Sequence, residues 1–375
     1  MFKMRVLFSM GSIFFFLCLT ILILSCQRKP SLNPRERGIA HRIKKIRSLE
    51  ALVERVDTVY LSAPDSILID YDVIVLLSDS SIIIANRIEK NLVFFSRDGR
   101  FICVVGRRGE GPGEFQDIVC ASLSGDRIYV YDIRLQRVSV FRMDGSFDRA
   151  FRVDDPFLIR HMAVSSNGQV YFHHVPSERY PGFVSVLDSS GRVRKVLLGP
   201  KDWSYKAYFE RGLLDGGIQL SKDNVLFETN TYSYKISKAY PNGMTEEFGQ
   251  EPENYRGLPR ITPDKTETPE QLHNLTGKSS IVMPDFFLLS ESGLLLQDIL
   301  DPLSEYSNPT LWYYVYDTSG AFLGRIEPQV LLAEHNGYFV GYYLKYYLKY
   351  GSPKYGMAEQ RIPFDIILYK EKRFE

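Results

Sequence analysis

A glycine-rich segment carries the charged residues whose spacing could bind an anion. Residues 106–115 read GRRGEGPGEF, so two arginines and two glutamates are interspersed with four glycines and a proline. This composition demands several positive φ angles and fixes one φ at about −65°. Backbone N–H groups beside Arg107 and Arg108 could then form a nest for a carboxylate or a phosphate. The favoured alternative is a rigid corner between two strands, with Phe115 filling the gap between them. The residues involved in either case are Arg107, Arg108, Gly109, Glu110, Gly111, Gly113 and Glu114.

Two common catalytic signatures are missing from the sequence. The glycine-rich segment lacks the Lys-Ser/Thr end of a P-loop, so it does not predict nucleotide binding. The Gly-x-Ser-x-Gly pattern of a serine hydrolase is also absent.

Histidines and aspartates supply weaker candidates. His173 and His174 are neighbours on an expected strand and therefore point to opposite faces, so they cannot chelate one metal ion together. No zinc-ligand spacing occurs among the six histidines, and we expect neither a metal site nor a cofactor. Carboxylates gathered at the mouth of a channel could hydrolyse a glycosidic bond, although an aspartate beside a turn more often bonds its own backbone. The histidines are His41, His161, His173, His174, His273 and His335, and the aspartates are Asp132, Asp188 and Asp317.

Tyrosine and lysine recur every four residues between 342 and 350. This spacing would place Tyr342, Tyr346 and Tyr350 near one face of a short helix. Such a face could stack on sugar rings or anchor a partner protein. Packing of the helix against the rest of the domain is the favoured alternative.

A repeated strand–turn–strand unit predicts the architecture that must position these residues. The turn glycines Gly99, Gly145 and Gly191 follow one another at intervals of 46 residues, and Gly243 and Gly320 belong to weaker copies. A period of about 40–50 residues made only of strands is typical of a β-propeller blade. We therefore predict an all-β fold, a six-bladed β-propeller, with five or seven blades as alternatives.

The blades can be placed along residues 49–375. An additional strand is expected at residues 51–61, and it would complete the last blade and close the ring by joining the two ends of the domain. An insertion at about 250–284, with five prolines, is expected to separate the fourth and fifth blades. The blades are expected at about 72–106, 118–153, 160–198, 217–249, 293–317 and 337–369.

The first 48 residues carry a targeting signal and a tether. Lys3 and Arg5 precede an apolar run that ends in Leu24-Ser25-Cys26. A basic start followed by an apolar core is typical of a secretory signal, here residues 1–25. Residues 26–48, basic and polar with little apolar content, are expected to be a tether that holds the domain off the membrane. A transmembrane anchor is the alternative for the apolar run, and either one places the domain outside the cytoplasm.

Charge and cysteine content limit the partners. Without residues 1–25 the chain has 44 basic and 45 acidic residues, so we do not expect a nucleic acid partner. Two cysteines lie within the domain, Cys103 on an expected outer strand and Cys120 on the next inner strand. These strands should be too far apart for a disulfide, and both cysteines are expected to be core residues.

The Ser-Cys ending of the signal resembles a bacterial lipobox, which implies cleavage before Cys26 and lipid attachment to its thiol. The glycine-rich segment, the Asp-Gly hairpins and the lipobox together resemble the six-bladed β-propeller lipoproteins of Bacteroidota, which are similar in form to NHL-repeat and TolB propellers. The resemblance implies an exported protein and no established catalytic residues.

We therefore expect an outer-membrane lipoprotein that faces the periplasm and is held at the membrane by its lipid. Its expected role is to bind or scaffold an envelope protein or a glycan, without catalysis. A carbohydrate hydrolase or lyase with carboxylates at the channel mouth is the alternative, and a structural spacer is a third. No ligand is identified by the sequence.

Overall fold

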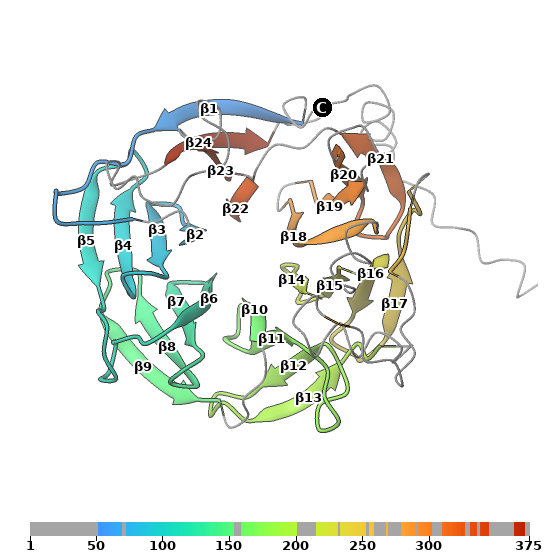
Figure 1. The fold of residues 1–375 in the computed structure, drawn as a ribbon, viewed down its shortest axis with the longest axis horizontal. Helices are drawn as coiled ribbons and strands as arrows, with labels where there is room; N and C mark the ends of the chain where they lie inside the picture. The colour runs from blue at the N-terminus through green and yellow to red at the C-terminus, as the bar shows by residue number, and fades with distance from the viewer. Residues whose placement is uncertain are drawn as a thin grey trace, which may run out of the picture.

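In a computed structural model the protein is an all-β propeller (Figure 1). Every helix or strand assigned among the described residues is a β-strand. The structure describes residues 52–69, 73–153, 159–200, 215–231, 233–252, 255–258, 268, 279–289, 292–301, 310–326, 331–335, 338–344 and 364–371. The signal, the tether, His41, His273, Tyr346 and Tyr350 lie outside this part of the chain.

Five antiparallel sheets are each built from four consecutive strands, and we call them blades one to five. Blade one contains β2 (Val73–Leu77), β3 (Ser81–Asn86), β4 (Asn91–Ser96) and β5 (Phe101–Val105). Blade two contains β6 (Ile118–Ser124), β7 (Arg127–Asp132), β8 (Arg137–Arg142) and β9 (Phe147–Arg152). Blade three contains β10 (Ile159–Val164), β11 (Val170–His174), β12 (Val184–Leu187) and β13 (Val193–Leu197). Blade four contains β14 (Gly216–Leu220), β15 (Leu226–Asn230), β16 (Ser233–Ala239) and β17 (Thr245–Phe248). Blade five contains β18 (Ile281–Leu288), β19 (Leu295–Asp301), β20 (Thr310–Tyr316) and β21 (Phe322–Ile326).

A further four-stranded sheet joins the two ends of the domain. It contains β22 (Leu331–His335), β23 (Tyr338–Leu344), β24 (Phe364–Glu371) and β1 (Val53–Val59), and we call it the composite sheet. β1 pairs antiparallel with β24, from Val53 opposite Glu371 to Val59 opposite Ile366. The expected pairing of the N-terminal strand with the last strand is confirmed.

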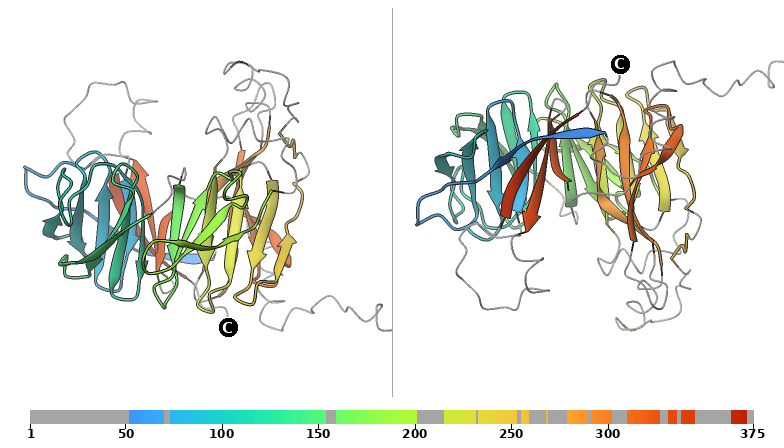
Figure 2. Two further views of the ribbon diagram at one scale, coloured as in Figure 1. Left: turned by 90° about the horizontal axis from the view of Figure 1, so that it is seen from below. Right: turned by 90° about the horizontal axis from the view of Figure 1, so that it is seen from above.

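The sheets stand around a central axis, with the first strand of each blade innermost and the fourth outermost (Figure 1). Seen from the side, the strands run across the thickness of the ring (Figure 2). β3 is buried along its whole length because strands flank both its edges and neighbouring sheets cover both its faces. Its isoleucines fit this environment, since branched side chains pack well on a pleated surface.

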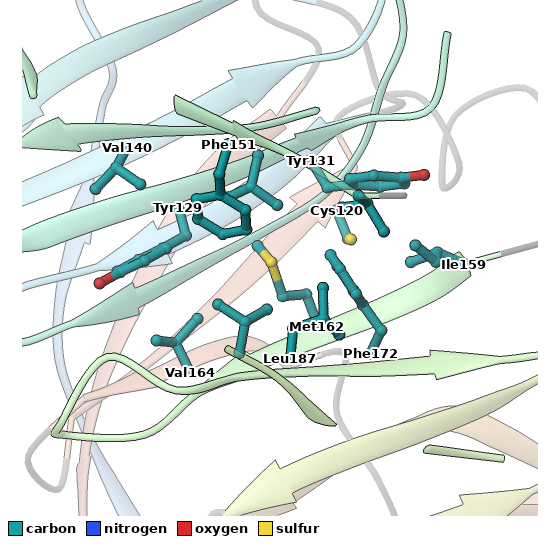
Figure 3. Close-up of a cluster of buried hydrophobic side chains, with 13 residues drawn as sticks. Cys120, Tyr129, Tyr131, Val140, Phe151, Ile159, Met162, Val164, Phe172 and Leu187 are labelled. Carbon is teal, nitrogen blue, oxygen red and sulfur yellow. The ribbon is translucent and has the colours of Figure 1, made fainter. Parts of the chain in front are cut away.

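The core lies between adjacent blades, where apolar side chains from facing sheets interdigitate. Figure 3 shows the layer between blades two and three. There the ring of Tyr131 on β7 lies 5.0 Å from that of Phe172 on β11, measured between centroids. This layer also contains Cys120, which is buried, while Cys103 on β5 is half-buried; both are free thiols, and burial raises the pKa of each.

Three expectations about the last third of the chain were wrong. β18 begins at Ile281, inside the expected insertion, and β22 was not expected at all. Tyr342 lies in the strand β23, opposite Ile366 of β24, and not in a helix. A spacing of four is a multiple of the strand repeat of two and lies close to the helix repeat of 3.6, so the tyrosine pattern could not distinguish strand from helix. The pairing with β24 shows that Tyr342 is in a strand.

Candidate functional site

Buried polar side chains gather where blades three and four meet. His173 on β11 and Glu228 on β15 are both buried, and Nε2 of His173 lies 3.4 Å from Oε1 of Glu228. Closer to the axis, Nε2 of His161 on β10 lies 3.8 Å from Oδ1 of Asp215, which directly precedes β14. With Asn230, whose Nδ2 donates a hydrogen bond to Oε1 of Glu228, these residues form what we call the blade three–four cluster.

Strand register and one glycine bring the cluster together. His161 lies opposite His173 in the β10–β11 ladder, just after a bulge at Arg160. Bulges of this kind redirect side chains and are frequent beside functional sites. On the other side, Gly216 approaches the His173 ring so closely that a Cβ there would lie 2.5 Å from Nε2. Only glycine allows β14 to pass this close to the histidine.

Burial sets the protonation of the cluster's inner pair. Removal from water lowers the pKa of His173 to about 3 and raises that of Glu228 to about 8, because burial disfavours the charged form of each. At neutral pH the imidazole is therefore uncharged and the carboxyl group keeps its proton. The pair therefore has no net charge.

Several buried atoms of these strands make no hydrogen bond within the described residues. They are Nδ1 and Nε2 of His173, Oε2 of Glu228, Oγ1 of Thr229 and Oδ1 of Asn230. Buried polar atoms are nearly always hydrogen-bonded, so a concentration of unpartnered ones is unusual.

The fold itself does not require polar residues at these places. In the second strands of blades one, two and four, Ile84, Val130 and Glu228 occupy matching positions. Each lies two residues after an apolar residue that pairs with a leucine of the first strand: Ile82 with Leu77, Ile128 with Leu123, and Leu226 with Leu220. Blade five has Gln297 there, fully buried and with both amide atoms unpartnered in the described structure. Blades one and two thus fill this position with apolar side chains, and blades four and five do not.

His174 belongs to a different environment from His173. Its Nε2 is 2.7 Å from Oγ of Ser185, and its Nδ1 is 3.0 Å from the carbonyl oxygen of Val175. Burial lowers its pKa to about 4. The two histidines point away from each other, as strand geometry predicts, and no group of three potential metal ligands occurs among the described residues.

The glycine-rich segment uses its polar groups within the chain. Glu114 accepts hydrogen bonds from Nε of Arg107 at 2.7 Å and from the N–H of Gly111 at 2.9 Å. The Arg107 hydrogen bond lowers the pKa of Glu114. Gly109 N–H donates to the carbonyl oxygen of Phe115, and Phe115 N–H donates to that of Arg107. The carboxylate bound by this segment is thus its own Glu114, held by one guanidinium and one backbone N–H.

Arg137 on β8 binds the glycine-rich segment, and this contact was not predicted from the sequence. Its guanidinium donates hydrogen bonds to the carbonyl oxygens of Glu110, Gly111 and Glu114 at 2.7–3.0 Å. Phe115 is fully buried, 5.8 Å from the ring of Phe141. Nothing in the sequence near Arg137 indicates this contact, since it joins residues about 25 positions apart.

The three aspartates bond to backbone groups. Asp188 and Asp317 each accept hydrogen bonds from N–H groups of their own turns. Asp132 is fully buried and accepts from the N–H groups of Gln116, Asp117 and Leu135. All three therefore stabilise turns and corners.

His173 was singled out in the sequence as a metal-ligand candidate and set aside, whereas Glu228 was overlooked. The available signal was a glutamate within the strand sequence Leu-Phe-Glu-Thr-Asn, at a place where the earlier repeats have Ile84 and Val130.

In the part of the chain that the structure describes, no helix is long and apolar enough to cross a membrane.

Comparison with known proteins identifies a family and a fold. Residues 39–319 match the family described as "Domain of unknown function (DUF4934)". A candidate exported protein from Bacteroides fragilis has a similar structure, with a TM-score of 0.62 and 14% sequence identity, over 87% of this chain and 97% of that one. A member of the DUF4221 family from Bacteroides vulgatus gives a TM-score of 0.55 and 9% identity, over 85% and 97%. No curated protein matches in sequence. At these identities the two structures indicate a shared fold alone.

Proposed function

The chain belongs to the DUF4934 family, and from this premise we propose that it is an exported, lipid-anchored β-propeller that binds a protein or a glycan at the cell envelope. The composite sheet is counted as a sixth blade, because it has four strands and its outer strand, β1, contacts blade one as each blade contacts the next. Lipid attachment at Cys26 and a place on the periplasmic side of the outer membrane complete the proposal.

The blade three–four cluster is the observation that carries a binding role. It combines unpartnered buried polar atoms with His161 on β10 and Asp215 just before β14, whose side chains are 29% and 34% exposed. Perturbed titratable groups in such a place are typical of functional sites. The candidate export of the similar B. fragilis protein supports the envelope location.

A catalytic alternative would use carboxylates at the channel mouth. The residues considered for it are Asp132, Asp188 and Asp317, and each accepts hydrogen bonds from backbone N–H groups of turns or corners. The glycine-rich segment is proposed as a corner for the same reason, since its charged and backbone groups bond one another.

The proposal is tested by purifying the tagged, full-length protein in detergent from its own membrane and identifying what accompanies it by mass spectrometry. Recovery of one envelope protein or glycan in a fixed ratio supports the binding role. Recovery of the propeller alone, together with failure to bind any ligand on glycan arrays, contradicts it. The Cys26→Ser variant tests the lipid attachment. It should no longer be found in the membrane fraction if the Cys26 thiol carries the lipid. A variant that stays in the membrane fraction would favour a transmembrane anchor.

A further inference from the structure

We infer that the blade three–four cluster is a binding site for a neutral ligand with adjacent hydroxyl groups, the chemistry of a sugar ring. This inference rests on the proposed binding function and names its site and its ligand class. His161 and Asp215 would contact the ligand, and His173, Glu228 and Asn230 would hold and polarise them from behind.

The first argument is that the buried polar residues of the cluster lower the stability of the fold, so a role in binding would explain their presence. Apolar residues fill the matching position in blades one and two, so a propeller blade does not need Glu228 there. Buried polar atoms without partners cost folding free energy. Glu228 accepts a hydrogen bond from Asn230 at Oε1, but its Oε2 has no partner among the described residues. Residues that break a local rule of folding are expected mainly at functional sites.

The second argument is accessibility. β10 and β14 are the innermost strands of their blades (Figure 1). His161 and Asp215 remain about one third exposed there, whereas His173 and Glu228 behind them are at most 4% exposed. A ligand in the centre of the ring would therefore meet an imidazole and a carboxylate first.

The third argument is the charge of the site, which selects the ligand class. His173 and Glu228 are uncharged at neutral pH, since burial lowers the pKa of the first and raises that of the second. Asp215 and Arg160, which have opposite charges, both act on His173: beside the larger effect of burial, Asp215 raises the pKa of His173 and Arg160 lowers it. A site without net charge gains little from a phosphate or a carboxylate. It offers both donors and acceptors, which is what hydroxyl groups require.

The fourth argument is that the site is rigid before any ligand arrives. The ring of Phe183 lies parallel to that of His173, at 6.1 Å between centroids and 3° between planes. Gly216 closes the opposite side. A group held in place in this way loses little conformational freedom on binding.

The experiment measures binding of the full-length protein, and of two variants, to an array of neutral and acidic oligosaccharides. The affinity for the retained glycans is then determined by calorimetry. His161→Ala and Asp215→Asn alter half-exposed residues and should leave the fold intact, which melting curves check. Ser122→Ala, at a half-buried serine on the innermost strand of blade two, is the matched control. We expect retention of neutral glycans, at least tenfold weaker binding by both cluster variants, and unchanged binding by the control.

A second readout does not depend on substitutions. Adding the retained glycan to protein labelled with ¹⁵N in its histidines should shift the ring signals of His161. Unmoved signals would place the ligand elsewhere and overturn the inference.

The remaining outcomes separate the site from the function. Neutral-glycan binding that both variants retain in full would overturn the site and leave the binding role standing. Retention of acidic glycans alone, or of a protein partner but no glycan, would overturn the ligand class. Absence of every ligand and partner would overturn both proposals.

Discussion

Gly99 touches the backbone of Tyr60, so closely that a Cβ on the glycine would overlap the tyrosine carbonyl oxygen and lie 2.8 Å from Cγ1 of Val59. Gly99 turns the hairpin between β4 and β5, and Tyr60 directly follows β1. The same relationship recurs around the ring, where a hairpin glycine meets the outer strand of the preceding blade. The recurring pairs are Gly145 with Val105, Gly191 with Arg152 and Gly320 with Phe248.

This contact explains why the repeat keeps its glycines. Each of these glycines has a positive φ, which allows the tight turn. At each of them a Cβ atom would also lie too close to an atom of the neighbouring sheet. It also places β1 in the role of an outer strand, since Tyr60 meets Gly99 as Arg152 meets Gly191.

Gly191→Ala should destabilise the protein far more than Gly125→Ala. Both glycines have positive φ angles, +86° and +58°, so each substitution strains the backbone by about 1–2 kcal/mol. A Cβ at Gly191 would also collide with the backbone of Arg152, whereas one at Gly125 meets nothing within 4 Å. Urea denaturation monitored by circular dichroism measures both, and equal losses would contradict the interlocking role.

Val59→Asp should reveal whether β1 is part of the cooperative fold. Val59 is 4% exposed and packs with Ile366, while Val56 on the same strand is 50% exposed. Burying an aspartate in place of Val59 should cost roughly 3 kcal/mol, from lost apolar burial and a desolvated polar group. Val56→Asp is the matched control and should change the melting temperature little. Identical melting temperatures for the two variants would mean that β1 adds nothing to the stability of the ring.

Arg137→Ala should cost about 2–3 kcal/mol of unfolding free energy, because hydrogen bonds from a charged donor to three carbonyl oxygens are lost. The exposed Arg134 provides the control. Its substitution by alanine should be nearly neutral. Arg137→Lys should recover only part of the loss, since an ammonium group lacks the planar fork that reaches all three oxygens. Full stability of Arg137→Ala would show that the corner holds without it.

Glu228→Gln should change how stability depends on pH. The folded-state pKa of Glu228 is raised to about 8 from 4.5, so its contribution to stability is fully present below pH 4.5 and is lost as the pH rises through 8. His173 has the opposite sign: its pKa falls from 6.5 to about 3, so its contribution is present above pH 6.5 and is lost as the pH falls towards 3. Glutamine cannot titrate and removes only the first effect.

The unfolding free energy of the wild type minus that of Glu228→Gln should therefore fall by roughly 1.4 kcal/mol per pH unit between pH 4.5 and 8. Denaturant titrations at several pH values within this window give that difference directly. Glu110→Gln, the same substitution at an exposed glutamate, is the matched control. A flat difference for Glu228→Gln would mean that its carboxyl group is ionised in the folded protein.

Local patterns in the sequence predicted most of the architecture. The hairpin glycines located blades one to three, and the additional strand at residues 51–61 was assigned to the last sheet because that sheet lacked strands. Where the hairpin signal fades, prediction failed: β22 was missed, and β18 was hidden by the proline-rich stretch before it.

The blade three–four cluster could not be predicted from local patterns in the sequence. His173 and Glu228 lie on the second strands of different blades, and their distance of 3.4 Å depends on how the blades pack around the ring. The contact of Arg137 with the glycine-rich corner has the same character, because a turn pattern does not say which distant side chain will cover it.

The composite sheet has a mechanical consequence. No hairpin links β1 to β24, so only their backbone pairing and side-chain contacts resist separation of these two strands. A pull applied to the polypeptide that precedes residue 52 would act on β1 before any other strand. Tension from that direction would therefore open the ring at one defined seam, between β1 and β24, while blades one to five could stay folded.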